Sequence, residues 1–238
     1  MIDIHNHVIF EIDDGAKSLS QALDMLKVFI EQGVNCIIAT PHFRRDMFPY
    51  DLDMMNRNYE LLKQQVVREG LPIELHQGHE AFLDEYLLEN LIEGRCNTLA
   101  GSDYVLVEIL SLEYFEITKR MLFDLASHGF IPIIAHCERL VREKQDLDKL
   151  IELQSFGYYL QVNASALETS KRWLRQWIVM SLENETISFV ASDAHNLTQR
   201  PIKMEMAYRI LSREIGEKKT KEVMGENQRR IIKNLTIH

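Results

Sequence analysis

The sequence predicts an α/β fold in which seven parallel strands, each followed by a helix, curve into a distorted barrel. Short apolar runs rich in β-branched residues alternate about seven times with segments of helical periodicity. That order is typical of βαβ units with right-handed crossovers, which build parallel sheets. A chain of 238 residues is long enough to form such a (β/α)7, TIM-like barrel as a single domain, residues 1–238.

The first elements show how the pattern is recognised. Within 1–7, apolar Ile2 and Ile4 alternate with polar Asp3 and His5, as expected for a strand. A loop over 8–17 carries an Asp-Asp-Gly turn signal. Ser18 then begins a helix, because Gln21 three residues later completes a capping-box pattern. The next run, 34–40, is almost continuously apolar, which indicates a strand buried on both faces.

The remaining elements follow the same rules, and most of the predicted helices end at a glycine. Further strands are predicted at 72–77, 104–110, 131–135, 158–162 and 187–191. Further helices are predicted at 51–69, 84–92, 116–128, 146–155, 168–182, 202–215 and 218–234. No internal repeat, low-complexity tract or linker interrupts the series.

Composition narrows the class of protein. The net charge is −9 and there is no basic block, which argues against a nucleic-acid partner. No apolar run reaches the ~18 residues of a membrane helix, so no membrane insertion is expected. The chain has no signal-peptide pattern, and its three cysteines (Cys36, Cys96 and Cys137) have no metal-type spacing. We therefore expect a reduced, cytoplasmic location.

Chemically active side chains gather at the predicted strand ends. His5 and His7 stand at i and i+2 of an extended segment, so their side chains point the same way, and Asp193 and His195 repeat that arrangement. Further candidates at or near strand ends are Asp14, His42, Glu80, Glu108 and His136. Because the carboxyl ends of parallel strands form one face of a barrel, these residues are predicted to meet there.

Each candidate also has a plain structural interpretation. His136 alone could be an ordinary buried histidine, and Asp14 could serve only the turn. If all these plain interpretations were correct, unrelated histidines and carboxylates would have gathered by chance at the same end of several strands. A multinuclear metal site is therefore the better hypothesis. Imidazoles and carboxylates without thiolates suit Mn²⁺, with Fe²⁺ or Zn²⁺ as alternatives. The donors are too many for one ion, which predicts two or three ions with Glu80 as a bridge.

The remaining histidines and Cys137 are not expected to bind the metal or to act in catalysis. His79 is expected at most to support the metal ligands without binding an ion itself. His76, His128 and His238 are interpreted as structural, helix-end and terminal residues. His136-Cys137 resembles the start of the catalytic loop of cysteine phosphatases, but the sixth residue after Cys137 is Glu143 instead of arginine. A thiol nucleophile is therefore rejected.

Taken together, several segments resemble the motifs of the polymerase and histidinol phosphatase (PHP) superfamily. These segments are Met-Ile-Asp-Ile-His-Asn-His, Asp-Asp-Gly, Thr-Pro-His, Gly-His-Glu, Val-Glu-Ile, Ile-Ile-Ala-His-Cys-Glu-Arg and Ala-Ser-Asp-Ala-His-Asn. More closely, the chain resembles bacterial manganese-dependent protein-tyrosine phosphatases of capsule and exopolysaccharide operons. The chain departs from similar proteins at His79, where they commonly have Gln or Ala, and at Cys137, where they usually have Pro or Ile.

The resemblance implies a PHP fold with a trinuclear centre and assigns ligands to each ion. The first ion would be held by His5, His7, Glu80 and Asp193. The second would be held by Glu80, Glu108 and His136, and the third by Asp14, His42 and His195. It also implies that Arg139 contacts the substrate phosphate, and that the partner is the phosphotyrosine tail of a bacterial tyrosine kinase.

The predicted activity is hydrolysis of a phosphomonoester by a metal-bridged hydroxide. Arg139, and also Arg44 and Arg45 in the loop after His42, would neutralise the phosphate charge, although Arg44 and Arg45 could equally be solvated loop charges. Two alternatives stay open: a small-molecule phosphatase of histidinol-phosphatase type, and a non-catalytic partner-binding module that keeps its metals for structure. A nuclease is disfavoured by the acidic charge.

Overall fold

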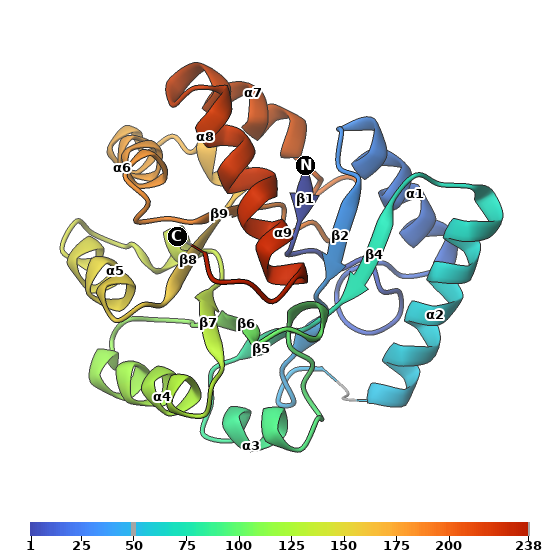
Figure 1. The fold of residues 1–238 in the computed structure, drawn as a ribbon, viewed down its shortest axis with the longest axis horizontal. Helices are drawn as coiled ribbons and strands as arrows, with labels where there is room; N and C mark the ends of the chain where they lie inside the picture. The colour runs from blue at the N-terminus through green and yellow to red at the C-terminus, as the bar shows by residue number, and fades with distance from the viewer. Residues whose placement is uncertain (49–50, 238) are drawn as a thin grey trace.

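Two parallel sheets form the centre of the molecule, and helices ring them (Figure 1). The computed structural model describes residues 1–48 and 51–237. Within these residues the strands are β1 (Ile2–Asp3), β2 (Cys36–Ala39), β3 (His42–Phe43), β4 (Glu74–Gln77), β5 (Glu80–Phe82), β6 (Tyr104–Glu108), β7 (Ile131–Ile134), β8 (Tyr159–Asn163) and β9 (Phe189–Ala191). One sheet has the order β1-β2-β4, the other has the order β3-β5-β6-β7-β8-β9, and all pairs are parallel.

Backbone hydrogen bonds connect the two sheets at both junctions. Between β2 and β3, Pro41 has no N–H to donate, which interrupts the ladder, but its carbonyl still accepts from Glu80 N at 3.1 Å. At the other junction, His7 N donates to Ala194 O at 2.9 Å, and Asn6 and Ala194 form an isolated parallel bridge. The predicted parallel α/β fold is therefore confirmed. The predicted count of seven strands is not confirmed, because the described residues form nine strands in two sheets.

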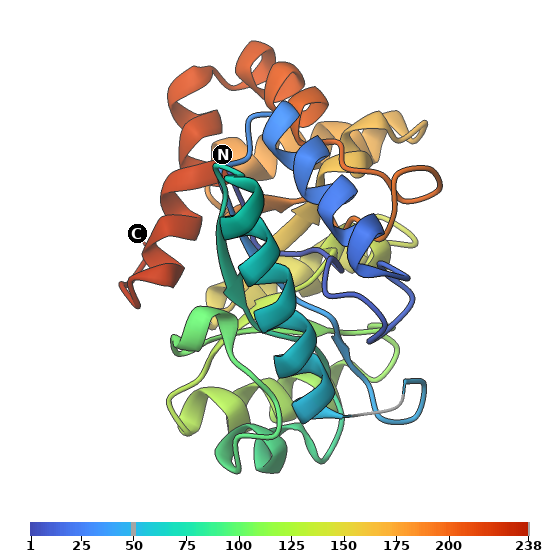
Figure 2. The ribbon, with the colours of Figure 1, turned by 90° about the vertical axis from the view of Figure 1, so that its right-hand side faces the viewer.

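The helices cover the outside of the curled strands. They are α1 (Leu19–Glu31), α2 (Leu52–Glu69), α3 (Leu87–Ile92), α4 (Phe115–Ser127), α5 (Asp146–Ser155), α6 (Arg172–Glu183), α7 (Met204–Glu214), α8 (Glu217–Lys221) and α9 (Asn227–Ile232). Figure 2 shows α1 and α2 side by side on one flank. The predicted cap is confirmed, since Ser18 Oγ accepts from Gln21 N at 3.2 Å. The helix expected at 168–182 instead begins at Arg172, after a 3₁₀ segment, and a π turn at Glu222–Glu226 interrupts the helix expected at 218–234.

The apolar core has two parts because successive strand residues point to opposite faces. Leu106 and Ile133 belong to an inner cluster enclosed by the strands, whereas Val107 and Ile134 pack outward against the helices. Helix α9 and the C-terminal segment lie across the amino ends of the strands (Figure 1). Tyr104 Oη donates to Leu235 O at 2.9 Å and holds that segment in place. The carboxyl ends, where the candidate ligands lie, are at the opposite side.

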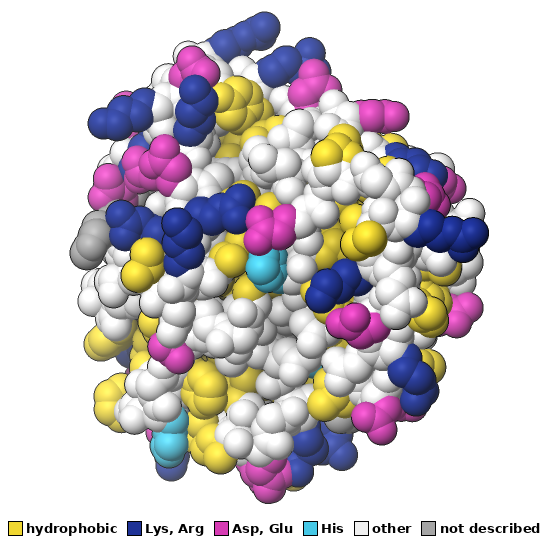
Figure 3. Space-filling view, turned by 45° about the vertical axis from the view of Figure 1, so that its right-hand side comes forward, with side chains coloured by type: hydrophobic (Ala, Val, Ile, Leu, Met, Phe, Trp, Pro, Cys, Tyr) yellow, Lys and Arg dark blue, Asp and Glu magenta, His cyan; other side chains and the backbone are white. Residues whose placement is uncertain are grey.

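The helices and one face of the surface can be compared with the composition. Within residues 1–48 and 51–237, no helix combines the length and hydropathy needed to cross a bilayer. On the face shown in Figure 3, acidic and basic side chains are interspersed.

Substitution of Tyr104 tests the role of the C-terminal segment. Tyr104→Phe should lower the free energy of unfolding by about 1 kcal/mol, because the hydrogen bond from the Tyr104 hydroxyl to the Leu235 carbonyl is lost. Urea denaturation measures the change. Tyr114→Phe is the matched control, because the Tyr114 side chain is 68% exposed; an equal loss of stability in both variants would refute this role.

Candidate metal centre

One group of candidate ligands combines the first and last strands of the chain. His5 and His7 follow β1, Asp193 follows β9, and Glu80 begins β5. One donor atom from each of these residues lies within 4.8 Å of the others. His5 Nε2 is 3.2 Å from Glu80 Oε2 and 3.4 Å from Asp193 Oδ1. This group coincides with the set that the resemblance implies for the first ion.

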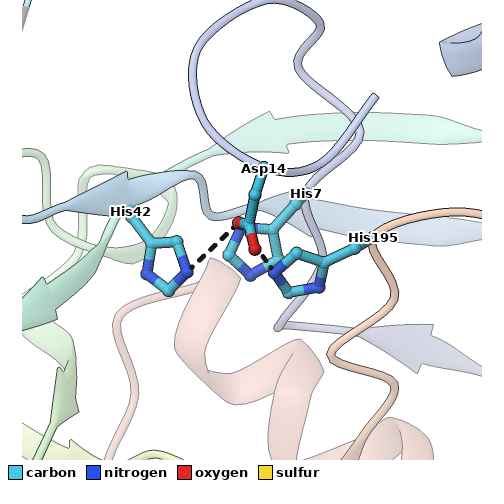
Figure 4. A group of neighbouring side chains, drawn as sticks. All are labelled: His7, Asp14, His42 and His195. Carbon is cyan, nitrogen blue, oxygen red and sulfur yellow. Dashed lines mark ion pairs between the residues drawn. The ribbon is translucent and has the colours of Figure 1, made fainter. Parts of the chain in front are cut away.

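A second group is formed by His7, Asp14, His42 and His195, whose side chains converge in Figure 4. Asp14 Oδ1 lies 3.3 Å from His195 Nε2 and 3.6 Å from His42 Nε2. The rings of His7 and His195 stack, with their centroids 3.6 Å apart. The loop over 8–17 therefore carries Asp14 back over the strand ends, as the sequence predicts.

Glu80 and Glu108 form a third group with His42, and His136 lies beside it. His136 Nε2 lies 2.8 Å from Glu80 Oε1 and 3.8 Å from Glu108 Oε1. His42 Nδ1 lies 2.9 Å from Glu80 Oε2. The resemblance implies His136 as the imidazole here, whereas the group whose donor atoms all lie within 4.8 Å of one another consists of His42, Glu80 and Glu108.

Seven donor atoms of these groups are buried and make no hydrogen bond. They are His5 Nε2, His7 Nε2, Asp14 Oδ1, His42 Nδ1, Glu80 Oε2, Glu108 Oε2 and His195 Nε2. Buried polar atoms are almost always hydrogen-bonded in folded proteins, so such a concentration of orphaned atoms requires another partner. Imidazole nitrogens and carboxylate oxygens that converge on one space fit divalent cations.

Supporting residues hold the histidines with one nitrogen facing the cluster. His5 Nδ1 lies 3.0 Å from Gln161 Oε1, and His7 Nδ1 lies 2.6 Å from Asp13 Oδ2. Partners of this kind fix the ring and leave Nε2 free to bind a metal. Sequence reasoning missed both supporting residues. Two features of the sequence could have indicated them: Asp13 is a second aspartate beside Asp14, and Gln161 is a polar residue inside an otherwise apolar strand.

Two site residues adopt an unusual backbone conformation. His136 has φ 32° and Asp193 has φ 52°, in the left-handed region that non-glycine residues seldom occupy. Such conformations persist where surrounding structure enforces them, and they concentrate at functional sites. Here they follow β7 and β9 and turn each side chain toward the cluster.

The electrostatics of the cluster reflect close packing of opposite charges. Burial lowers the pKa of His5, but the carboxylates of Glu80 and Asp193 more than offset it and raise the pKa to about 9. Burial by itself would raise the pKa of Glu80. The neighbouring histidines, His5 above all, outweigh burial and hold the pKa of Glu80 well below its usual range. Burial likewise lowers the pKa of His7, but that pKa is raised overall, chiefly by the charge of Asp13, so protons on His5 and His7 balance part of the carboxylate charge when no ion is bound.

Arginines border the cluster. Arg139 donates to Asp193 Oδ2 while its side chain stays 49% exposed. Arg44 lies over the Phe82 ring, 4.5 Å from its centroid, with Nη1 3.9 Å from Glu108 Oε2.

The other arginines differ in their relation to the cluster. Arg45 is exposed, and no contact joins its side chain to the cluster within the described residues. Arg200, which sequence reasoning missed, donates to Asp14 Oδ2.

Two residues that the sequence set aside stay outside the ligand groups. Burial raises the pKa of the Cys137 thiol well above its usual range, which opposes the thiolate that a cysteine phosphatase needs. Burial lowers the pKa of His79 to about 3, so its ring is neutral, and its Nδ1 accepts from Asn97 N at 2.8 Å.

Gly15 allows the loop to pass close to His7, and its substitution tests the geometry. A Cβ at Gly15 would lie 2.2 Å from His7 O and 2.4 Å from His7 Cβ. Gly15→Ala should therefore displace Asp14 and weaken metal binding about 10- to 100-fold, as measured by elemental analysis and titration. Gly225→Ala, where an added Cβ meets nothing within 4 Å, is the control. Equal affinities in the two variants would contradict the arrangement.

The cluster should release protons when it binds a cation. His5 has its pKa raised to about 9 and must lose its proton before a metal can bind, so apparent affinity should rise with pH below that value. Each displaced proton contributes about tenfold per pH unit. Calorimetric titrations in buffers of different ionisation enthalpy count the protons. An affinity independent of pH between 6 and 8 would rule out this account.

Comparisons with known proteins agree over the whole chain. The family model for "Capsular polysaccharide synthesis, CpsB/CapC" matches residues 1–233. Tyrosine-protein phosphatase CpsB of Streptococcus pneumoniae is 31% identical over 238 residues, covering 98% of each chain. The putative tyrosine-protein phosphatase CapC of Staphylococcus aureus is 32% identical over 209 residues, covering 87% of this chain and 82% of the relative.

Solved structures give the same result. A crystal structure from work on YwqE of Bacillus subtilis and CpsB of Streptococcus pneumoniae, described as unique metal-dependent tyrosine phosphatases, matches with a TM-score of 0.90 at 27% identity, covering 100% of this chain and 96% of the other. Histidinol phosphate phosphatase of Lactococcus lactis, complexed with zinc, L-histidinol and phosphate, shares the fold, with a TM-score of 0.61 at 14% identity and 94% of each chain covered. The chain belongs to the CpsB/CapC family of capsular polysaccharide synthesis.

Proposed function

We propose that this chain is a manganese-dependent protein-tyrosine phosphatase. The observation that carries the proposal is the set of buried imidazole and carboxylate atoms that converge without hydrogen-bond partners. Relatives named tyrosine-protein phosphatases along the whole chain support the substrate class. Nitrogen and oxygen donors without thiolates suit Mn²⁺, and Fe²⁺ or Zn²⁺ would also fit.

The proposed ligands would hold three ions, and Glu80 would be shared by the first two. His5, His7, Glu80 and Asp193 would hold the first ion. Glu80, Glu108 and His136 would hold the second, and Asp14, His42 and His195 the third. Bound divalent ions would lower the pKa of a water molecule and neutralise charge on the substrate phosphate.

The proposed role of Arg139 is to bind that phosphate. Its guanidinium uses one N–H on Asp193, and the remaining donors can serve an anion at the exposed edge of the cluster. Arg44 and Arg45 would contribute further positive charge from the turn after β3; contacts of Arg44 with Phe82 and Asp46 favour a fixed position for it. A phenol leaves readily, since its pKa is about 10, so the reaction needs little help from a general acid.

The proposed substrate is the phosphotyrosine tail of a bacterial tyrosine kinase that controls capsular or exopolysaccharide synthesis, in the cytoplasm. The support is the membership of the CpsB/CapC family and the names of its relatives. We also propose that the strands act as one distorted seven-stranded barrel, in which β2 continues into β3 and β4 into β5.

A small-molecule phosphatase is the second candidate, favoured by the fold shared with histidinol phosphate phosphatase of Lactococcus lactis. A metal-stripped sample assayed with each divalent ion added back separates the hypotheses. We expect Mn²⁺ to restore turnover of a phosphotyrosine peptide and little turnover of histidinol phosphate. The reverse preference would favour the second candidate. A folded, Mn²⁺-loaded protein that hydrolyses neither substrate would favour a partner-binding module.

Substitution of Arg139 tests phosphate binding separately from metal binding. Arg139→Ala should lower kcat/KM by about 10²- to 10³-fold, because the phosphate loses a fixed positive charge. Metal content should stay unchanged, because the proposed ligands are intact. Arg142→Ala, an exposed arginine three residues later, is the control. Full activity in Arg139→Ala would defeat the assigned role.

A further inference from the structure

A separate set of metal-binding side chains lies at the opposite ends of the strands. Cys36 begins β2, Glu74 begins β4, and His76 lies two residues along β4. Cys36 and Glu74 are direct partners in the parallel ladder, and Glu74 and His76 point to the same face. One donor atom from each residue lies within 4.8 Å of the others. His42 lies six residues beyond Cys36, so about 20 Å of extended chain separates this group from the cluster.

The donors of this group differ in kind from those of the cluster. A thiol, an imidazole and a carboxylate are ligands that zinc accepts, commonly with water in a fourth position. Thiolate ligands select softer ions than Mn²⁺. The side chain of Cys36 is fully buried, whereas those of His76 and Glu74 are 25% and 47% exposed, so a cation can approach from solvent.

Glu74 is held in a position suited to a ligand. Arg229, from α9, donates through Nη1 to Glu74 Oε2 at 2.8 Å, and Glu74 Oε1 lies 2.8 Å from His76 Nε2. The hydrogen bond with Arg229 and the contact with His76 lower the pKa of Glu74 to about 2, so the carboxylate stays ionised. One oxygen is therefore fixed by Arg229, and the other faces the imidazole. Ligating carboxylates are commonly supported in this way.

We propose that Cys36, Glu74 and His76 bind one zinc ion that clamps β2 to β4. As the bond from Sγ to zinc forms, the S–H bond breaks and the proton passes to solvent. Donors around a tetrahedral zinc lie about 3.5 Å apart, so Glu74 Oε1 and His76 Nε2, which are 2.8 Å apart, would separate slightly.

Cobalt substitution tests this site without depending on phosphatase activity. Full-length protein loaded with Co²⁺ should show a thiolate-to-cobalt charge-transfer absorption, to which the imidazoles and carboxylates of the cluster cannot contribute. Cys36→Ser should remove the absorption and lower zinc content by one ion per chain, while Mn²⁺-supported activity stays unchanged. Cys96→Ser, which alters another buried cysteine, should keep both signals.

A second variant guards against misfolding of Cys36→Ser. His76→Gln alters a partly exposed side chain and should lower zinc content and the cobalt absorption while leaving the circular dichroism spectrum unchanged. Absence of the absorption from cobalt-loaded wild type, or its persistence in Cys36→Ser, would overturn the proposal. Neither result bears on the phosphatase, since the two sites share no residue.

Discussion

The rest of the site depends on the contacts between the buried carboxylate of Glu80 and the histidines around it. Its two oxygens lie within 3.2 Å of nitrogens from His5, His42 and His136, which come from three separate parts of the chain. A buried carboxylate is costly unless cations or hydrogen-bond donors surround it. The strand ends must therefore converge around this one group.

Convergence requires the first and last strands to meet in a fixed register. Asp3, fully buried, accepts hydrogen bonds from Ser192 N and Ser192 Oγ, both at 2.7 Å, and from Asn6 at 3.0 Å. These bonds link β1 to β9. Each strand continues into an i, i+2 pair of ligands, His5 with His7 and Asp193 with His195. A shift of one residue in this register would turn His5 and His7 away from Asp193 and His195. The buried hydrogen bonds between Asp3 and Ser192 therefore help to fix the register.

The two ends of the strands serve different purposes. The carboxyl ends carry imidazoles and carboxylates, with the partly exposed side chains of Arg139 and Asp14 at the edge of the cluster. The amino ends are covered by α9 and the C-terminal segment through contacts such as Tyr104 to Leu235. At the edge of that cover, Arg229 reaches Glu74 beside Cys36 and His76. The fold therefore keeps the thiol of Cys36 apart from the imidazoles and carboxylates of the cluster, which suit harder ions.

The sequence by itself determined the alternation of strands and helices and the cap at Ser18, because both depend on spacing within a few residues. It also determined which side chains stand at strand ends. Tertiary structure alone decided what depends on neighbours across the fold: the bridge between Asn6 and Ala194, the support of His5 by Gln161, and the approach of Cys36 to His76. Contacts between strands follow from register and packing, and no local pattern records which distant residue will lie opposite.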